Sequence, residues 1–356
     1  MAPPIVPLDT PPDKICVLRL SALGDATHTV PVVRALRKAW PDTQLTWIIG
    51  KLEQRLLAGL PDVEFIVYDK RGGRPARQAL KEALRERRFD LLLHMQVALR
   101  ANLLSRLIKA PIRLGWDRGR SRDGHRWFST HQVREVPFQH QVQGFLEFPR
   151  ALGLDPDPPQ WDLPITSADH DWARDKLPGE GPFLMISPCS SHRLRNWSVA
   201  GYAAVADHAA RQHGLRVVLM GGPSDLERET AAAIQQSMRE SALNLVGQDT
   251  LTQSLALLQR ASVLLTPDSG PAHMASALNT PVVGLHAATW SRRSGPYHSL
   301  DLCVDRYAEA ARRFRGKEPE QLRWGHRIEE PGVMDLITVE AVQERLAAAM
   351  ARSDRG

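Results

Sequence analysis

The sequence lacks the long apolar run that a membrane-spanning helix requires. No stretch of about 18 consecutive apolar residues, the shortest that crosses a bilayer as a helix, occurs in the 356 residues. The opening residues, MAPPIVPLDTPPDK, have neither the basic head nor the apolar stretch of a signal peptide. We therefore expect a protein that is neither exported nor membrane-spanning and that resides in the cytoplasm.

Cysteine is scarce as well. Cys16, Cys189 and Cys303 are odd in number, far apart and flanked by apolar residues. Disulfide frameworks and structural metal sites use more cysteines at closer spacing. We therefore predict reduced core thiols and no metal site. The D-x-D sequence at 155–157 is discounted as a metal motif because it lies among prolines.

Two common nucleotide-binding motifs are also missing. The sequence contains neither G-x-G-x-x-G after a strand nor G-x-x-x-x-G-K-[ST], so the standard dinucleotide and P-loop sites lose their main support. Aromatic residues make up only 6% of the chain, and no recognition helix or stacking motif accompanies them. This argues against a nucleic-acid or other polyanion binder.

What the sequence does have is positive charge. The formal net charge is +6, which favours an anionic partner. Basic residues gather in two stretches of the first half, 70–88 and 113–134. Four of them lie beside two glycines and a proline, where we expect a loop: Lys70, Arg71, Arg74 and Arg77. Anion binding by this loop and simple solvation remain open alternatives.

Strand-like runs alternate with helical periods along both halves. The expected strands are 15–20, 45–49, 65–68 and 91–94 in the first half, and 183–187, 215–220, 263–266 and 282–285 in the second. This alternation predicts α/β domains with parallel sheets. Residues 152–164 hold four prolines and no helical period. We place a linker there and divide the chain into domains 1–160 and 161–356.

Ligands of such sheets bind at the carboxyl ends of the strands. The first loop of this kind, Ser21-Ala22-Leu23-Gly24-Asp25, places a carboxylate at the start of a helix. Asp25 would serve there either as a helix N-cap or as a general base that receives the proton of an acceptor hydroxyl. The loop alone does not choose between these roles.

The second half has three such loops. Residues 187–197, SPCSSHRLRNW, combine hydroxyls and arginines that suit a diphosphate. Residues 221–225 end a strand and would bring backbone or a carboxylate to a ribose. At Asp268-Ser269-Gly270, a helix beginning near Pro271 offers free N–H groups to an anion, and we expect Asp268 to accept from the amides of the turn. His273 would either contact the ligand or pack against neighbouring side chains.

Together these loops resemble a family. LRLSALGDATHTVPVVRALRKAWP and DSGPAHMASALNTPVVGLHAATWSRRSGPY are similar to the opening and the donor-binding segment of bacterial ADP-heptose:lipopolysaccharide heptosyltransferases, which belong to glycosyltransferase family 9. The spacing of SPCSSHRLRNW and VVLMGGPSDLE matches too. The resemblance therefore extends over nearly the whole chain.

The resemblance implies a GT-B fold, in which two Rossmann-like domains with parallel sheets face a central cleft. The first domain would bind the acceptor and the second the nucleotide sugar, and a last helix at about 338–350 would cross back to the first domain. The implied enzyme is an inverting glycosyltransferase that moves a heptose or related sugar from an ADP-sugar to a lipopolysaccharide inner-core acceptor.

The resemblance also implies roles for individual residues. Asp25 matches the base for the acceptor hydroxyl, and Arg195 matches a cation that neutralises the leaving diphosphate. The donor-binding residues would be Ser190, Ser191, Asp225, Thr250, Leu251, Asp268, Ser269, Gly270 and His273. The acceptor phosphates would meet Lys70, Arg71, Arg74 and Arg77.

No cofactor or metal is expected beyond the ADP-sugar substrate. The expected partners are an ADP-heptose-like donor and a phosphorylated lipopolysaccharide core or lipid A acceptor, with no nucleic acid. A peripheral contact with the cytoplasmic face of the inner membrane is left open. A different sugar nucleotide or glycan acceptor, and a sugar-nucleotide epimerase that needs no acceptor, remain the alternatives.

Overall fold

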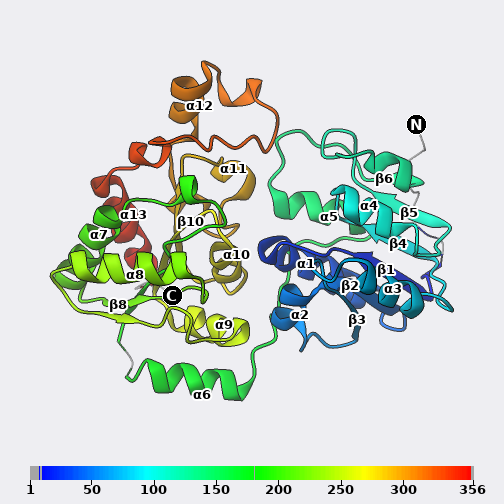
Figure 1. Cartoon of the computed structure of the whole chain (residues 1–356), viewed down its shortest axis with the longest axis horizontal. Coiled ribbons are helices and arrows are strands. Elements are labelled where there is room, and N and C mark those ends of the chain that lie inside the picture. The colour runs from blue at the N-terminus through cyan, green and yellow to red at the C-terminus, as the bar shows by residue number, and fades with distance from the viewer. Residues whose placement is uncertain (1–7, 9, 180, 354–356) are drawn as a thin grey trace. The chain divides into compact units, whose positions relative to one another are not determined.

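The chain folds into two compact α/β units, Met1–Pro164 and Ile165–Gly356. The structure is a computed structural model and describes residue 8, residues 10–179 and residues 181–353. Figure 1 shows the first unit in blue to green and the second in green to red. The expected reaction cleft between the two domains stays a prediction.

Unit 1 contains one six-stranded sheet in which every neighbouring pair of strands is parallel. The sheet order is β3-β2-β1-β4-β5-β6. The strands are β1 (Lys14–Leu18), β2 (Gln44–Gly50), β3 (Val63–Tyr68), β4 (Leu91–His94), β5 (Ile112–Gly115) and β6 (His131–Gln132). The helices are α1 (Leu23–Ala39), α2 (Lys51–Leu57), α3 (Gly73–Ala83), α4 (Leu99–Ser105) and α5 (Gln141–Ala151), with a 3₁₀ turn, η1 (His125–Phe128).

Unit 2 repeats this plan with the order β12-β11-β10-β7-β8-β9. Its strands are β7 (Phe183–Ile186), β8 (Arg216–Leu219), β9 (Ala242–Asn244), β10 (Val263–Pro267), β11 (Val282–His286) and β12 (Val304–Asp305). Its helices are α6 (Ser167–Lys176), α7 (Val199–His213), α8 (Asp225–Ser237), α9 (Leu251–Arg260), α10 (Gly270–Ala277), α11 (Ser291–Ser294), α12 (Tyr307–Arg315) and α13 (Val339–Ser353).

The central strands are buried on both faces because helices cover both sides of each sheet. All residues of β4, β7, β10 and β11 are buried, which explains why these segments are mostly apolar rather than alternating. The predicted α/β class with parallel sheets is confirmed. The three cysteines are buried and unpaired, as predicted.

The basic stretch near residue 70 is not wholly a loop, which corrects the sequence prediction. The helix α3 begins at Gly73, so Arg74 and Arg77 lie on its first turns. Gly72 and Gly73 form the turn into the helix, and Gly73 has a positive φ of 55°. Pro75 does not break the helix, because the first turn of a helix has no N–H partner to lose.

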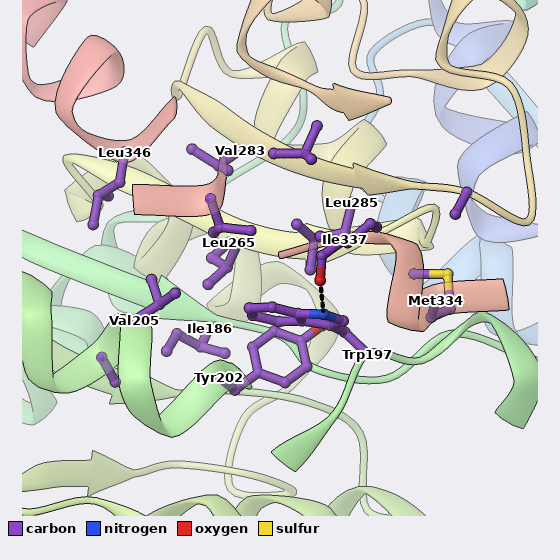
Figure 2. Packing of buried hydrophobic residues seen from close by; sticks show 14 of the residues in the cluster. Ile186, Trp197, Tyr202, Val205, Leu265, Val283, Leu285, Met334, Ile337 and Leu346 are labelled. Atoms are coloured by element: carbon purple, nitrogen blue, oxygen red, sulfur yellow. Dashed lines mark hydrogen bonds between the residues drawn. The ribbon is translucent and has the colours of Figure 1, made fainter. Parts of the chain in front are cut away.

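The core of unit 2 ties its last segment to the loop that follows β7. The Trp197 indole N–H donates to the Ile337 carbonyl oxygen at 3.0 Å, and its ring packs edge-on against Tyr202 (Figure 2). The helix α13 packs against α7 and contributes Leu346 to the same buried cluster. The expected crossing of this helix to the first domain stays a prediction.

None of the helices in the described part of the chain is both long and apolar enough to cross a membrane.

Candidate active site

Asp25, Arg195 and Asp268 lie where the strand order of each sheet reverses. In unit 1 the chain moves outward in one direction from β1 and in the other from β4, and in unit 2 the same reversal separates β7 from β10. Connections that leave in opposite directions open a crevice at the carboxyl ends of these strands. Asp25 follows β1, Arg195 follows β7 and Asp268 follows β10.

Asp25 is held by side chains from two other segments. Its carboxylate is ion-paired with Arg19 and accepts a hydrogen bond from the Gln141 amide. It also accepts from the Ala22 N–H at 3.2 Å, and 22% of its side chain is exposed. Ala22 is the N-cap of α1, and Asp25 lies three residues further on. The N-cap interpretation of Asp25 is therefore wrong, although the residue does satisfy the N-cap backbone.

Arg19 itself is anchored at the reversal point between β1 and β4. Its Nη1 donates to the Met95 carbonyl oxygen at 2.5 Å, and its guanidinium lies 5.2 Å from the centre of the Phe145 ring. Gln96 accepts from the Leu20 N–H at 2.6 Å. These bonds fix the cation beside Asp25, so the carboxylate is oriented by structure that follows β4 and by α5.

Two buried histidines lie beyond Arg19. The rings of His94 and His125 are 4.4 Å apart, and His125 Nε2 accepts from the Trp116 N–H at 3.1 Å. Burial lowers the pKa of His125 to about 4 and places that of His94 well below its ordinary value. Both rings are therefore neutral near pH 7 and add no positive charge next to Arg19. No periodic pattern in the sequence marks this pair.

The four predicted acceptor residues have unequal surroundings. Lys70 Nζ lies 3.3 Å from the carboxylate of Glu53, which is almost completely buried. Arg71, Arg74 and Arg77 are exposed and form no ion pair within the described residues. Arg74 and Arg77 line a surface hollow together with other residues of α3. Three of the four cations are thus available to an anion.

The loop after β7 carries Ser190, Ser191 and Arg195. Ser190 N–H and Oγ both donate to Asn196 Oδ1, at 2.7 and 2.9 Å. Arg195 Nη2 donates to Ser191 Oγ at 2.6 Å, and Arg195 Nε lies 3.4 Å from a Glu329 oxygen. The structure therefore brings a cation and two hydroxyls together in one loop, as the sequence predicts.

Arg195 is only 5% exposed. Burial lowers the pKa of its guanidinium and the nearby Arg327 lowers it further, whereas the carboxylates around it act in the opposite direction. A guanidinium remains charged despite such shifts. Glu329 and Arg327, which sequence analysis missed, thus set the charge around Arg195. They lie more than 130 positions beyond it, and no local motif marks them.

The loop after β10 is joined directly to the loop after β7. Thr266 Oγ1 donates to the Ser187 carbonyl oxygen at 2.8 Å and lies 2.9 Å from Ser269 Oγ. Ser269 is the N-cap of α10, whose first residue is Gly270. The N–H groups at the start of α10 therefore lie beside the loop that carries Arg195.

Asp268 is held by side chains, which corrects the expectation that it accepts from the amides of its turn. One carboxylate oxygen lies 3.6 Å from His273 Nε2, and the other accepts from Ser294 Oγ at 3.1 Å. Burial raises the pKa of Asp268, but the hydrogen bond from His273 and the neighbouring His286 ring outweigh burial and hold it well below its ordinary value. His273 therefore pairs with Asp268. The sequence analysis expected it either to contact the ligand or to pack, and did not predict this pairing.

The remaining donor candidates lie in loops that follow strands farther from the reversal point. Asp225 begins α8 and is exposed, whereas Glu227 turns back to accept from the Gly222 N–H at 2.8 Å. Thr250 caps α9 by accepting from the Gln253 N–H at 3.2 Å, and Leu251 is the next residue. Their loops follow β8 and β9, one and two strands beyond β7. Their proposed contacts with the nucleotide-sugar donor stay predictions.

Comparisons with known proteins point to one family over most of the chain. Residues 77–322 match the model of glycosyltransferase family 9 (heptosyltransferase). The chain is 37% identical over 331 residues to the lipopolysaccharide core heptosyltransferase OpsX of Haemophilus influenzae, covering 93% of this chain and 95% of that protein. It resembles the crystal structure of a family 9 glycosyl transferase from Veillonella parvula, with a TM-score of 0.79, 23% identity and coverage of 96% and 98%. It also resembles Escherichia coli heptosyltransferase WaaC with ADP, with a TM-score of 0.69, 18% identity and coverage of 94% and 99%.

The side-chain cage around Asp268 predicts a stability effect. Asp268→Asn should lower the free energy of unfolding of unit 2 by roughly 2 kcal/mol, because hydrogen bonds to a buried charged group are lost or weakened. Urea unfolding followed by tryptophan fluorescence measures this change. Asp225→Asn is the matched control, since its carboxylate is exposed, and it should leave stability unchanged. Equal losses in both variants would contradict the structural role of Asp268.

Proposed function

The chain belongs to glycosyltransferase family 9, and we propose that it transfers a heptose or a related sugar from an ADP-linked donor to a lipopolysaccharide inner-core acceptor. It is a glycosyltransferase with the GT-B fold, as the resemblance predicted. The observation that carries the proposal is the alignment of nearly the whole chain with a lipopolysaccharide core heptosyltransferase. We propose that the reaction takes place in the cytoplasm.

The donor diphosphate is assigned to the crevice between β7 and β10 in unit 2. Arg195 would neutralise the charge that develops on the leaving ADP, and Ser191 already accepts a hydrogen bond from this guanidinium. The first N–H groups of α10 and the Ser269 hydroxyl would bind the phosphate oxygens, since a helix N-terminus favours anions. This combination would carry the charge of the diphosphate without a metal ion.

Asp25 is assigned as the general base. In an inverting transfer, the acceptor oxygen forms a bond to the anomeric carbon while the bond from that carbon to the ADP oxygen breaks. The acceptor hydroxyl proton passes to the Asp25 carboxylate, and the electron pair leaves with ADP. One carboxylate is sufficient, because no covalent sugar–enzyme intermediate forms. Arg19 and Gln141 would hold the carboxylate in position for this proton transfer.

Acceptor phosphates are assigned to the exposed arginines that follow β3. Arg71, Arg74 and Arg77 have no ion-pair partner among the described residues and are therefore free to bind a phosphate with two parallel hydrogen bonds each. Lys70 is a weaker candidate, because Glu53 already holds its ammonium. A phosphorylated lipopolysaccharide core or lipid A would supply such groups.

The donor assignment predicts nucleotide binding by the full-length protein. Calorimetry should detect binding of ADP in preference to UDP and GDP. Arg195→Gln should lower the affinity for ADP by roughly tenfold or more, because one hydrogen bond to a charged group is lost. Arg193→Gln is the control, because Arg193 is an exposed neighbour in the same loop. A folded preparation that binds none of the three nucleotides would contradict the donor site.

The base assignment predicts a large loss of turnover in Asp25→Asn. Transfer should fall by on the order of a hundredfold or more, the usual contribution of a positioned base, while ADP affinity stays the same. Asn keeps an oxygen for the Ala22 N–H, so α1 should remain intact. Asp42→Asn, an exposed carboxylate in the same unit, should have parental turnover. If Asp25→Asn retains turnover within a few-fold, Asp25 is not the base.

The acceptor assignment predicts a selective effect on KM. Replacing Arg71 and Arg74 by Ala should raise KM for the phosphorylated acceptor and leave ADP affinity unchanged, because the two ligands are assigned to different units. Arg85→Ala with Arg88→Ala removes the same charge from exposed positions elsewhere in unit 1 and should leave KM unaltered. Mass spectrometry of the product distinguishes transfer from epimerisation, which would proceed with the sugar nucleotide alone.

A further inference from the structure

A tryptophan stands almost fully exposed on unit 1. Trp127, in the 3₁₀ turn η1, is 87% exposed, the largest exposed fraction of any large apolar side chain in the described ranges. Its ring lies against the backbone of Gly124, because a Cβ placed there would be 2.8 Å from Trp127 Cε3. Gly124 also has a positive φ of 69°. The indole is therefore supported by the loop while its outer face remains open to solvent.

Three arginines share a surface hollow of about 650 Å³ with this indole: Arg118, Arg122 and Arg126. All three are exposed, and their side chains form no ion pair with any residue that the structure describes. The acid in the hollow, Asp123, is turned toward α4, where it accepts from the Leu99 N–H at 3.1 Å. A carboxylate of Glu135 lies near Gly119. The hollow thus combines unpaired positive charge with one large amphipathic ring.

The loop that carries these residues is pinned to α4. Asn102 Nδ2 donates to the Asp123 carbonyl oxygen at 3.0 Å, and Asn102 Oδ1 lies 2.9 Å from His125 Nδ1. Beside this contact, Leu99 and Leu103 are 53% and 45% exposed. Four positions apart, they share one face of α4. The helix that holds this loop therefore also carries two exposed apolar side chains.

We propose that this surface, made of Arg118, Arg122, Arg126, Trp127 and the adjoining Leu99 and Leu103, docks on an anionic phospholipid bilayer. Tryptophan favours the membrane–water interface, where its ring is apolar and its N–H remains hydrated. Arginine binds phosphate groups with two parallel hydrogen bonds, and basic side chains are attracted to anionic lipid surfaces. The proposal does not depend on sugar transfer, since the surface contains none of the residues assigned to that reaction.

The chemistry of the surface favours a bilayer over single-stranded nucleic acid. Nucleic-acid binders of that kind present several aromatic rings on which successive bases stack. Here the hollow is lined by one tryptophan, and His125, the other ring beside it, is buried. The apolar neighbours on the adjoining helix are leucines, which insert among acyl chains and offer no stacking face.

The test measures binding of the full-length protein to vesicles of phosphatidylcholine with and without phosphatidylglycerol. We expect binding to the anionic vesicles, weaker binding at high salt, and little binding to the neutral ones. The triple change Arg118→Gln, Arg122→Gln and Arg126→Gln should weaken vesicle affinity by about a hundredfold, the product of three basic side chains near a charged surface. Trp127→Ala should weaken it roughly tenfold, as expected for partial burial of one large side chain.

Matched controls distinguish binding by this surface from nonspecific effects of charge and of exposed apolar side chains. Arg85→Gln with Arg88→Gln removes exposed charge elsewhere in unit 1, and Leu243→Ala removes an exposed leucine of unit 2; both should keep parental vesicle affinity. Brominated lipids should quench tryptophan fluorescence in the parent protein and less so in Trp127→Phe. Unchanged binding by the triple and Trp127 variants overturns the proposal, as does absence of binding to anionic vesicles. Tighter binding to single-stranded nucleic acid than to vesicles, lost in the same variants, also overturns it.

Discussion

The reversal of strand order in each parallel sheet is the constraint on which both candidate sites depend. All strands of a unit end at the same edge, and the connections from the two central strands leave in opposite directions. Polar side chains and helix N-termini can therefore meet there without being covered by a crossing connection. Asp25 owes its position to the reversal between β1 and β4, and Arg195 and Asp268 owe theirs to the reversal between β7 and β10.

The side chain assigned the main role at each reversal point is a carboxylate in unit 1 and a guanidinium in unit 2, and each is held by polar partners. In unit 1 a carboxylate is held by a guanidinium and an amide, whereas in unit 2 a guanidinium is held by a hydroxyl and a carboxylate. The first arrangement fits the proton acceptor proposed for unit 1, and the second fits the diphosphate-binding cation proposed for unit 2. In each case one partner comes from a distant segment, Gln141 for Asp25 and Glu329 for Arg195. The geometry of each charged group therefore depends on packing beyond its own loop. The loop that carries Arg195 ends at Trp197, whose buried indole fixes it to Ile337.

The sequence predicts those parts of this arrangement that are local. The buried strands β7 and β10 are mostly apolar, and the turns that follow them carry Ser191, Arg195 and Asp268 in contiguous motifs. Partners from distant segments leave no such signal: Gln141 lies 116 positions from Asp25. The strands β6 and β12 have two residues each, too few to show a period, and were not predicted. The start of α3 was missed because glycines and a proline in a first helical turn look like a loop.

The basic segment after β3 shows why residue type alone does not assign a binding role. In the sequence, Lys70 and Arg71 are equivalent neighbours. In the structure, the buried Glu53 carboxylate requires a compensating charge, because an unpaired buried charge is strongly destabilising, and Lys70 supplies it at 3.3 Å. If Lys70 bound an anion, Glu53 would lose its ion-pair partner. Arg71 is exposed and pairs with no carboxylate of the described residues, so it can bind an anion without this loss. The burial of one carboxylate therefore divides the basic residues into a cation that stabilises unit 1 and cations that are available to a ligand.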